Sequence, residues 1–348
     1  MNKGRPVNLE LEGVRGIACL FVALSHTLHL RHLDPSVILP PWVRTLEAGS
    51  TGVFIFFALS GYLISWTNTK PYTTAGYRSY LWRRFIRLAP IYYIACALTL
   101  VVHLFLGQDA EQNRRLLIAF FALQNYNDYF TFHAPPPMMN GPLWSLNFEL
   151  LYYGLFIALW RYQPRLSIIF IPAIVFAIFG WFAPHFMPLF LASYACGWIF
   201  WAAGWWLARL PELPATTTSP VITWLLLIFA SHQIGGLGRI LHALGLHSAD
   251  AGMVGLNQLG LLPPILLLIA AVSKRRLPIR FLIETASWSL CVVPLAGMLW
   301  TGRLWGEPAW ITGGIVVVIA AALRPIRSTL WLKAFAWFGS ISYAFYVV

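Results

Sequence analysis

Long apolar runs separated by short polar segments dominate this chain. Most runs approach the length that an α-helix needs to cross a bilayer, and they lack the strict alternation of barrel strands. We therefore predict an all-α fold, a polytopic integral membrane bundle of about 10–11 transmembrane helices plus one short or re-entrant helix. The predicted spans cover residues 13–30, 50–67, 81–106, 143–160, 166–183, 187–208, 219–232, 255–272, 281–300, 309–323 and 333–348.

The composition supports a membrane protein. Hydrophobic residues make up 59% of the 348 residues and charged residues only 10%, whereas a soluble domain carries about 25% charged residues. The net charge of +12 does not indicate nucleic-acid binding, because Lys and Arg gather in short segments between apolar runs, where they orient helices. The four cysteines lie far apart inside apolar runs, so no disulfide framework is expected.

The distribution of Lys and Arg predicts a cytoplasmic N-terminus. A shorter apolar run at 114–123 has about half the length of a span. If it does not cross, 17 Lys and Arg residues face the cytoplasm and six face the outside, which is the positive-inside bias. We therefore place residues 107–142 outside, as a loop with a short or re-entrant helix, and the protein in a bacterial inner membrane.

One membrane domain is expected to cover residues 1–348, with no fused soluble domain. The first apolar run lacks a small-residue cleavage site, so we interpret it as a retained span. The final run is short and has no polar exit, which indicates a last helix that is cut short at Val348.

Arg15 and His26 share one face of the first predicted span. Eleven residues amount to about 20° more than three helical turns and separate the two side chains by about 16 Å along the axis. Under the predicted topology Arg15 lies near the inner boundary and His26 in the outer half of the membrane, where ionisable groups usually face a polar cavity or a partner. The plainer interpretations are an interfacial anchor for Arg15 and a hydrogen-bonded bundle histidine for His26.

Histidines at positions 26, 29 and 32 have a spacing that is also compatible with metal ligands. No Cys or carboxylate stands at matching spacing, and His32 lies near the exit of the span. We therefore expect no metal site.

Three arginines open the third predicted span in the sequence SYLWRRFIRLAP. Arg84 and Arg87 are i, i+3 neighbours, and Arg83 and Arg87 are i, i+4 neighbours, so their side chains lie close together on a helix. Positive-inside anchoring accounts for some of them. A cationic rim of this kind also suits the phosphates of a nucleotide-like donor, because guanidinium groups bind phosphate bidentately.

The fourth full span, GPLWSLNFELLYYGLF, carries the carboxylate of Glu149 in its outer half. A lone carboxylate at this depth favours its protonated form, and a histidine at similar depth is a natural partner. His26 meets that condition under the predicted topology, although the sequence does not show contact between the two helices.

In the second span, the small pair Ser60-Gly61 predicts close helix packing.

Taken in order, these segments resemble the acyltransferase-3 family of membrane O-acyltransferases that act on carbohydrate hydroxyls. The resemblance rests on Arg-x10-His in the first span, GVFIFFALSGYLI in the second, RRFIRLAP in the third and PLWSLNFELLYY in the fourth, with GSISYAFYVV near the end. Residues 165–335 match only in hydrophobic character. Glu12 stands where Asp is common, Val14 where Leu is frequent, and Phe54 where an aspartate often lies.

The resemblance implies transfer of an acyl group, usually acetyl, from cytoplasmic acyl-CoA to a hydroxyl of a carbohydrate or glycolipid, such as a surface polysaccharide, lipopolysaccharide or exopolysaccharide. Acyl-CoA is then the donor substrate, and no cofactor is expected to be bound permanently. The acceptor and the lipid bilayer are the other expected partners, and nucleic acid is not one.

The resemblance also implies roles for individual residues. The implied catalytic residues are Arg15, His26 and Glu149. The residues implied to bind the donor are Arg83, Arg84, Arg87 and Arg15. His26 would act as a general base or carry the acyl group itself, and Glu149 would orient it or balance its charge.

Two other classes of protein are compatible with the apolar spans. A multi-span transporter or channel for a small polar or anionic solute accounts for buried charge, but not for a one-sided arginine cluster facing a deep histidine, and no internal repeat is visible. A non-catalytic membrane scaffold predicts that Arg84 and Arg87 tolerate replacement by alanine.

Overall fold

The computed structural model describes residues 8–29, 40–106, 110–121, 144–183, 189–246, 255–302 and 307–347. Within these ranges the regular secondary structure is helical, and the single isolated bridge joins Glu212 to Arg275. The prediction of an all-α fold is therefore confirmed for the described part of the chain.

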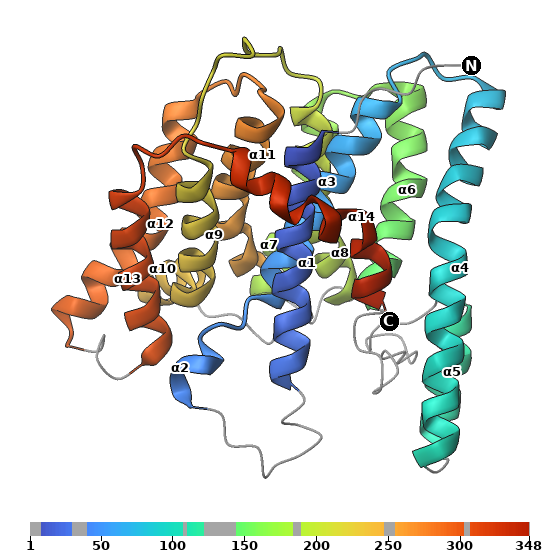
Figure 1. The fold of residues 1–348 in the computed structure, drawn as a ribbon, viewed down its shortest axis with the longest axis horizontal. Helices are drawn as coiled ribbons and strands as arrows, with labels where there is room; N and C mark the ends of the chain where they lie inside the picture. The colour runs from blue at the N-terminus through green and yellow to red at the C-terminus, as the bar shows by residue number, and fades with distance from the viewer. Residues whose placement is uncertain are drawn as a thin grey trace. The chain divides into compact units, whose positions relative to one another are not determined.

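Every predicted span contains a helix. The corresponding helices are α1 (Leu9–His29), α3 (Gly49–Thr67), α4 (Thr74–Leu106), α6 (Trp144–Tyr162), α7 (Leu166–Phe182), α8 (Leu189–Leu207), α9 (Val221–Ile234), α11 (Leu262–Ser273), α12 (Arg280–Trp300), α13 (Pro308–Ala322) and α14 (Ala336–Val347) (Figure 1). The shorter elements are α2 (Pro41–Arg44), α5 (Ala110–Phe120), α10 (Gly236–Ala243) and the 3-10 helices η4 (Leu256–Leu261) and η6 (Leu330–Phe335). Apolar runs form helices because a bilayer offers backbone polar groups no other partner.

Several of these helices can cross a membrane. Among the described residues, five helical segments are long and apolar enough: Leu9–Leu28, Gly49–Thr67, Thr74–Phe105, Leu256–Ser273 and Arg280–Trp300. A sixth is the pair α9 and α10, if this pair, bent by 42°, counts as one span. The chain is thus a multi-pass membrane protein, whereas the total of 10–11 spans and the cytoplasmic N-terminus stay predictions.

The short helix expected in the 107–142 loop is present as α5, with 11 residues. Residues 122–143, which contain the rest of that loop, lie outside the described residues. The predicted position of the loop on the outer side therefore stays untested, as does the expectation about the chain end at Val348.

The chain folds into two compact units. Unit 1 comprises residues Met1–Thr67, Phe200–His247 and Leu256–Ser342, and unit 2 comprises Asn68–Ile199 with residues Ser248–Gly255 and Tyr343–Val348. The boundary falls inside α8. The expectation of one domain over the whole chain stays a prediction.

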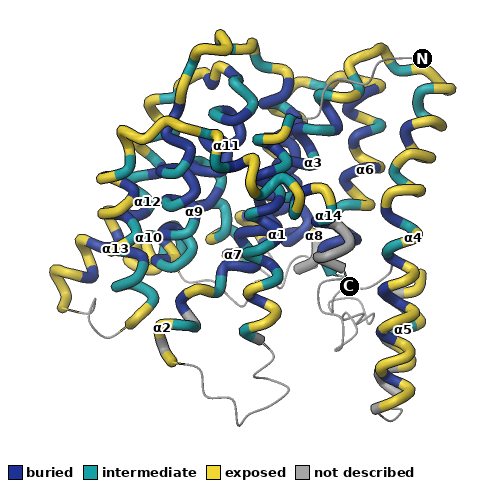
Figure 2. Tube along the Cα trace, viewed as in Figure 1, coloured by how far each residue is buried: buried dark blue, intermediate teal, exposed yellow. Residues whose placement is uncertain are grey.

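Unit 1 is built around α9 and α11. Helix α9 packs against α11, α12 and α13. Both α9 and α11 are apolar on nearly all sides, and a helix of that kind is buried by its neighbours. Their side chains Trp224, Leu227, Ile228, Ile265 and Leu268 are at most 1% exposed, and both helices are mostly buried along their length (Figure 2).

Glycines let two helices of unit 1 approach to backbone contact. A Cβ added at Gly61 of α3 would overlap the carbonyl of Trp201 on α8, and one added at Gly204 of α8 would overlap the carbonyl of Ala58 on α3. Small residues are the usual means of close helix packing in membranes. The close packing predicted from Ser60-Gly61 is confirmed at Gly61.

Aromatic side chains join α6 to its neighbours in unit 2. The rings of Phe148 and Tyr194 stack with centroids 4.1 Å apart, and the Tyr152 hydroxyl donates a hydrogen bond to the Tyr194 carbonyl at 2.8 Å. On α4, the Tyr80 hydroxyl donates to the backbone carbonyl of Tyr153 at 3.3 Å. These contacts fix the rotation of α6, and with it the direction of Glu149 and Tyr153.

We expect that no larger side chain can replace the glycines in the contact between α3 and α8. Gly61→Leu should destabilise the fold by about 1–3 kcal/mol or more, because the added atoms meet backbone rather than a flexible side chain. Gly297→Leu is the matched control, since no atom lies within 4 Å of a Cβ at that helical glycine. Thermal unfolding in detergent should show a large loss for the first variant and little change for the second; equal melting temperatures would contradict this packing.

Candidate functional site

Near its N-terminal end, α1 holds Arg15 in an ion pair. The Asn8 side chain caps the helix, accepting hydrogen bonds from the backbone N–H groups of Glu10 and Leu11 at 3.0 and 3.1 Å. One turn later, a terminal nitrogen of Arg15 lies 2.9 and 3.0 Å from the two carboxylate oxygens of Glu12. The exposed fractions of the two side chains are 13% and 18%, so the pair is largely shielded from water.

Two glycines that flank Arg15 in sequence explain why this turn is fixed. A Cβ at Gly13 would overlap the carbonyl of Leu332 in η6, and one at Gly16 would overlap the carbonyl of Phe335. In the opposite direction, a Cβ at Gly339 of α14 would overlap the carbonyl of Glu12. The C-terminal segment of unit 1 thus lies directly against the backbone that carries the Glu12–Arg15 pair.

His26 lies near the end of α1, where its side chain is exposed. Its neighbour Ser25 is 5% exposed and donates a hydrogen bond to a carboxylate oxygen of Glu47 at 3.4 Å. The Glu47 backbone carbonyl accepts a hydrogen bond from the Gln233 side chain on α9 at 3.1 Å. Within unit 1, therefore, polar groups from α1, α9 and the segment before α3 meet next to His26.

The structure gives the three arginines of α4 different surroundings. Arg83 donates to the Ser79 hydroxyl at 2.5 Å and to the Asn68 side chain at 3.4 Å. Arg84 lies between aromatic rings, with its guanidinium carbon 5.5 Å from the ring centroids of both Tyr80 and Tyr153. Arg87 is exposed.

Arg84 has no carboxylate partner among the described residues. Its two neighbouring rings give it cation–π contacts, but its Nε atom is buried without a hydrogen-bond partner. A buried charged donor that lacks a partner is costly, so this guanidinium is suited to an anionic ligand.

Glu149 is tied to the same aromatic group. The Tyr153 hydroxyl, one helical turn further along α6, donates a short hydrogen bond to a carboxylate oxygen of Glu149. The Tyr153 ring also faces Arg84. Unit 2 therefore brings together Glu149 and Arg84, two of the predicted site residues, through one tyrosine.

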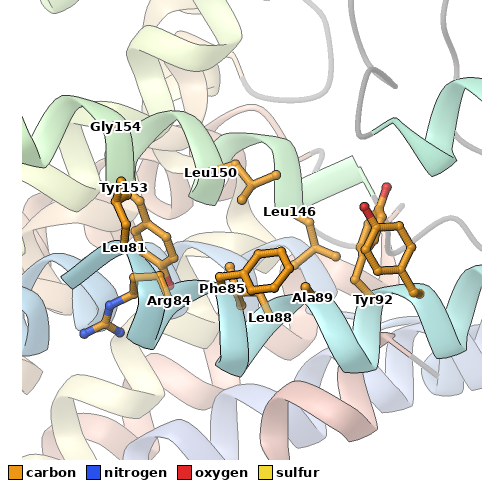
Figure 3. A pocket seen from close by; sticks show the side chains of 11 residues that line it. Leu81, Arg84, Phe85, Leu88, Ala89, Tyr92, Leu146, Leu150, Tyr153 and Gly154 are labelled. Carbon is orange, nitrogen blue, oxygen red and sulfur yellow. The ribbon is translucent and has the colours of Figure 1, made fainter. Parts of the chain in front are cut away.

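An apolar groove of about 430 Å³ runs between α4 and α6 beside Arg84. Figure 3 shows Arg84 at one end of the row of lining side chains and Tyr92 at the other. Leu88, Leu146 and Gly154 line it as well. Gly154 borders empty space: no atom would lie within 4 Å of a Cβ added at this position.

The other predicted contacts are not tested. Arg15 and His26 lie on the same helix of unit 1, whereas Arg84 and Glu149 belong to unit 2, so the pairing of His26 with Glu149 that the topology allows stays a prediction. His32 and the side chain of His29 lie outside the described residues, and the expectation of no metal site stays untested too.

Sequence reasoning missed several partners. The i, i+3 spacing of Glu12 and Arg15 is a recognised signal for an ion pair and could have revealed theirs. By contrast, nothing in the local sequence indicates that Glu47 lies beside Ser25 or that Tyr153 faces Arg84, because each contact joins two separate segments of the chain. The contact between Tyr80 and Arg84 is an i, i+4 pair on α4, and its spacing could have revealed it. Phe54, the position without the expected aspartate, is 1% exposed and stacks on Phe200 with centroids 4.7 Å apart.

The helical fold and its apolar helices of membrane-spanning length define a multi-pass membrane protein. Comparison with protein families then identifies its type: the model of the acyltransferase-3 family, described as an acyltransferase domain, matches residues 8–348. The chain belongs to this family. The family resemblance that the sequence motifs indicated is therefore confirmed.

A curated relative is more distant. The peptidoglycan O-acetyltransferase OatA of Listeria monocytogenes serovar 1/2a (strain ATCC BAA-679 / EGD-e) is 29% identical over 158 residues. The match covers 41% of this chain and 22% of the relative, so the chain corresponds to less than a quarter of that protein. No solved structure matches this chain.

Proposed function

We propose that this protein is a membrane O-acyltransferase that moves an acyl group, in the simplest case acetyl, from cytoplasmic acyl-CoA to a hydroxyl of a carbohydrate or glycoconjugate. The family supports the reaction type. The observation that carries the assignment of a CoA donor is Arg84, a guanidinium with a buried, unpartnered Nε at the head of an apolar groove.

The arginine cluster suits the charged part of the donor. Arg84 and Arg87 lie one turn apart on α4, and Arg83 lies beside them. Guanidinium groups bind phosphate oxygens through paired hydrogen bonds, and CoA carries several phosphates. In this proposal Arg83, Arg84 and Arg87 hold those phosphates, with Arg15 as a further candidate.

The groove suits the linear part of the donor. Residues Leu81 and Tyr93 mark its ends on α4, and twelve residues of helix extend about 18 Å. A pantetheine arm that carries a thioester is a linear chain of comparable length. The tyrosine hydroxyls of the lining can meet its amide groups, while the apolar side chains exclude water.

His26 and Glu149 supply the proposed chemistry. His26 accepts the proton of the acceptor hydroxyl, the hydroxyl oxygen attacks the thioester carbon, and the carbon–sulfur bond breaks. The CoA thiolate then takes the proton from the imidazolium, which leaves an ester and free CoA thiol. Glu149, held by Tyr153, stabilises the positive charge that develops in this step.

The acceptor is proposed to be a hydroxyl on a surface glycan or its lipid-linked precursor. The relative in Listeria is named a peptidoglycan O-acetyltransferase, which supports an envelope carbohydrate as the acceptor class. This placement agrees with a bacterial inner membrane, the location that we propose for the chain.

The proposed role of His26 as general base can be tested directly. His26→Ala should abolish acyl transfer, by at least about 100-fold, because removing a general base costs about 10²–10⁴ in rate. Membranes that contain the variant are incubated with radiolabelled acetyl-CoA, and glycans are analysed by mass for new esters. His242→Ala, an exposed histidine of α10, is the control; equal activity of His26→Ala and wild type would contradict the proposed role.

The arginine of the groove is expected to act on donor binding. Arg84→Ala should raise KM for acyl-CoA by about tenfold or more, because a charge-assisted hydrogen bond is lost. Arg165→Ala removes an exposed charge outside the groove and should leave KM unchanged. Equal effects of the two variants would indicate that Arg84 serves only to orient its helix.

The groove itself can be blocked without repacking. Gly154→Phe should keep the wild-type melting temperature, since its side chain enters open space, and should lower kcat/KM for acyl-CoA by about tenfold or more through lost donor binding. Gly297→Phe introduces the same residue at another open helical glycine and should retain activity. Full activity of Gly154→Phe would exclude the groove as the path of the donor.

A further inference from the structure

A second pocket in unit 1 is lined by three arginines that the proposed reaction does not use. It has a volume of about 200 Å³ and lies between the segment after α8, the end of α11 and the start of α12. Arg275, Arg276 and Arg280 line it, together with Ser219. In the sequence these arginines were counted only as charges that orient the chain.

The backbone around the arginines is rigidly held. Glu212 and Arg275 form a β-bridge, the Leu213 N–H donates to the Lys274 carbonyl at 2.6 Å, and the Arg276 N–H donates to the Pro211 carbonyl at 2.9 Å. Lys274 and Ile279 have φ angles of 53° and 50°, in the left-handed region that a β-branched residue such as Ile279 rarely adopts. This conformation fixes the backbone from which the side chains of Arg275 and Arg276 extend.

Two of the three arginines are paired with carboxylates within the protein. Arg275, 9% exposed, lies 2.9 Å from a Glu212 carboxylate oxygen and donates to the Leu210 carbonyl at 2.7 Å. Arg280 lies 2.7 Å from Glu284, whose other carboxylate oxygen is 3.6 Å from Arg324. These pairs hold their side chains in place at the pocket wall.

Arg276 is the exception. Its side chain is exposed, lines the pocket and makes no ion pair or hydrogen bond with any residue that the structure describes. The pocket therefore has an excess positive charge on the one arginine that can move toward a ligand. A guanidinium in this setting favours an anion with several oxygens.

Ser219 gives a second, independent indication of a ligand. It is 5% exposed, lines the pocket, and its hydroxyl has no hydrogen-bond partner among the described residues. The hydroxyl oxygen is not fully enclosed by protein, so a ligand in the pocket can accept its hydrogen bond. Ser219 also lies just before α9, a helix of 14 residues whose positive dipole end favours negative charge.

We propose that this pocket binds a phosphate group, through Arg276, the Ser219 hydroxyl and the positive field of the paired arginines. Its volume suits a phosphate or pyrophosphate rather than a whole nucleotide, and the three-oxygen face of a phosphate matches a guanidinium and a hydroxyl together. The site is distinct from the groove of unit 2 and does not depend on the proposed acyl transfer.

The test uses the full-length protein in nanodiscs of zwitterionic lipid. Binding of pyrophosphate, CoA and dephospho-CoA is measured by calorimetry for the wild type, Arg276→Gln, Ser219→Ala and Arg327→Gln. Arg276→Gln should raise Kd by about tenfold, and Ser219→Ala by about threefold. Arg327→Gln removes an exposed charge of the same unit that does not line the pocket and should change Kd little.

Comparison of binding by the different ligands shows which kind of molecule carries the phosphate. Weaker binding of both CoA and pyrophosphate to Arg276→Gln identifies a soluble phosphate ligand, and a loss confined to CoA and absent for dephospho-CoA identifies the 3′-phosphate of CoA. If only nanodiscs with phosphatidylglycerol show an Arg276-dependent interaction, the phosphate is that of a lipid. The proposal is overturned if Arg276→Gln changes none of these, or if Arg327→Gln has the same effect.

Thermal unfolding separates binding from folding. Arg276→Gln should melt at the wild-type temperature because its side chain holds no partner among the described residues, and Arg276→Lys should restore part of the affinity. A failure of acyl transfer in the assays above leaves this result unaffected, since no turnover is measured here.

Discussion

Backbone-to-backbone contact at glycines is the constraint on which unit 1 depends. In a bilayer there is no hydrophobic driving force between helices, so close van der Waals packing must hold them together. Gly61 and Gly204 bring α3 against α8, and Gly13, Gly16 and Gly339 bring α1 against the segment from η6 to α14. The second contact fixes the turn that carries Arg15, so a residue implied in catalysis is positioned by packing against a segment from the far end of the sequence.

Three of the described arginines have different surroundings. Arg15 is paired with Glu12. Arg84 is held between aromatic rings and keeps a buried nitrogen without a partner among the described residues. Arg276 is exposed beside a pocket whose other arginines are paired with carboxylates. Counting positive charges along the sequence predicts orientation in the membrane, but only the local partners distinguish an anchor from a ligand-binding group.

The helices could be predicted from the sequence because the need to satisfy backbone polar groups in lipid makes long apolar runs helical. The site could be predicted only in part. Motif order identified His26, Glu149 and the α4 arginines as candidates, and spacing placed Arg15 and His26 on one face. The contact of Tyr153 with Arg84, and the position of Glu47 beside Ser25, depend on how separate segments pack against each other, which no local pattern encodes. The hydrogen bond between Tyr153 and Glu149 is an i, i+4 contact within α6, which the spacing does encode.

The open space at Gly154 has an evolutionary consequence. Because a larger side chain at position 154 would displace no neighbour, substitutions at this one position can narrow the groove in steps. Related proteins can therefore differ in the width of this groove while the surrounding scaffold stays the same.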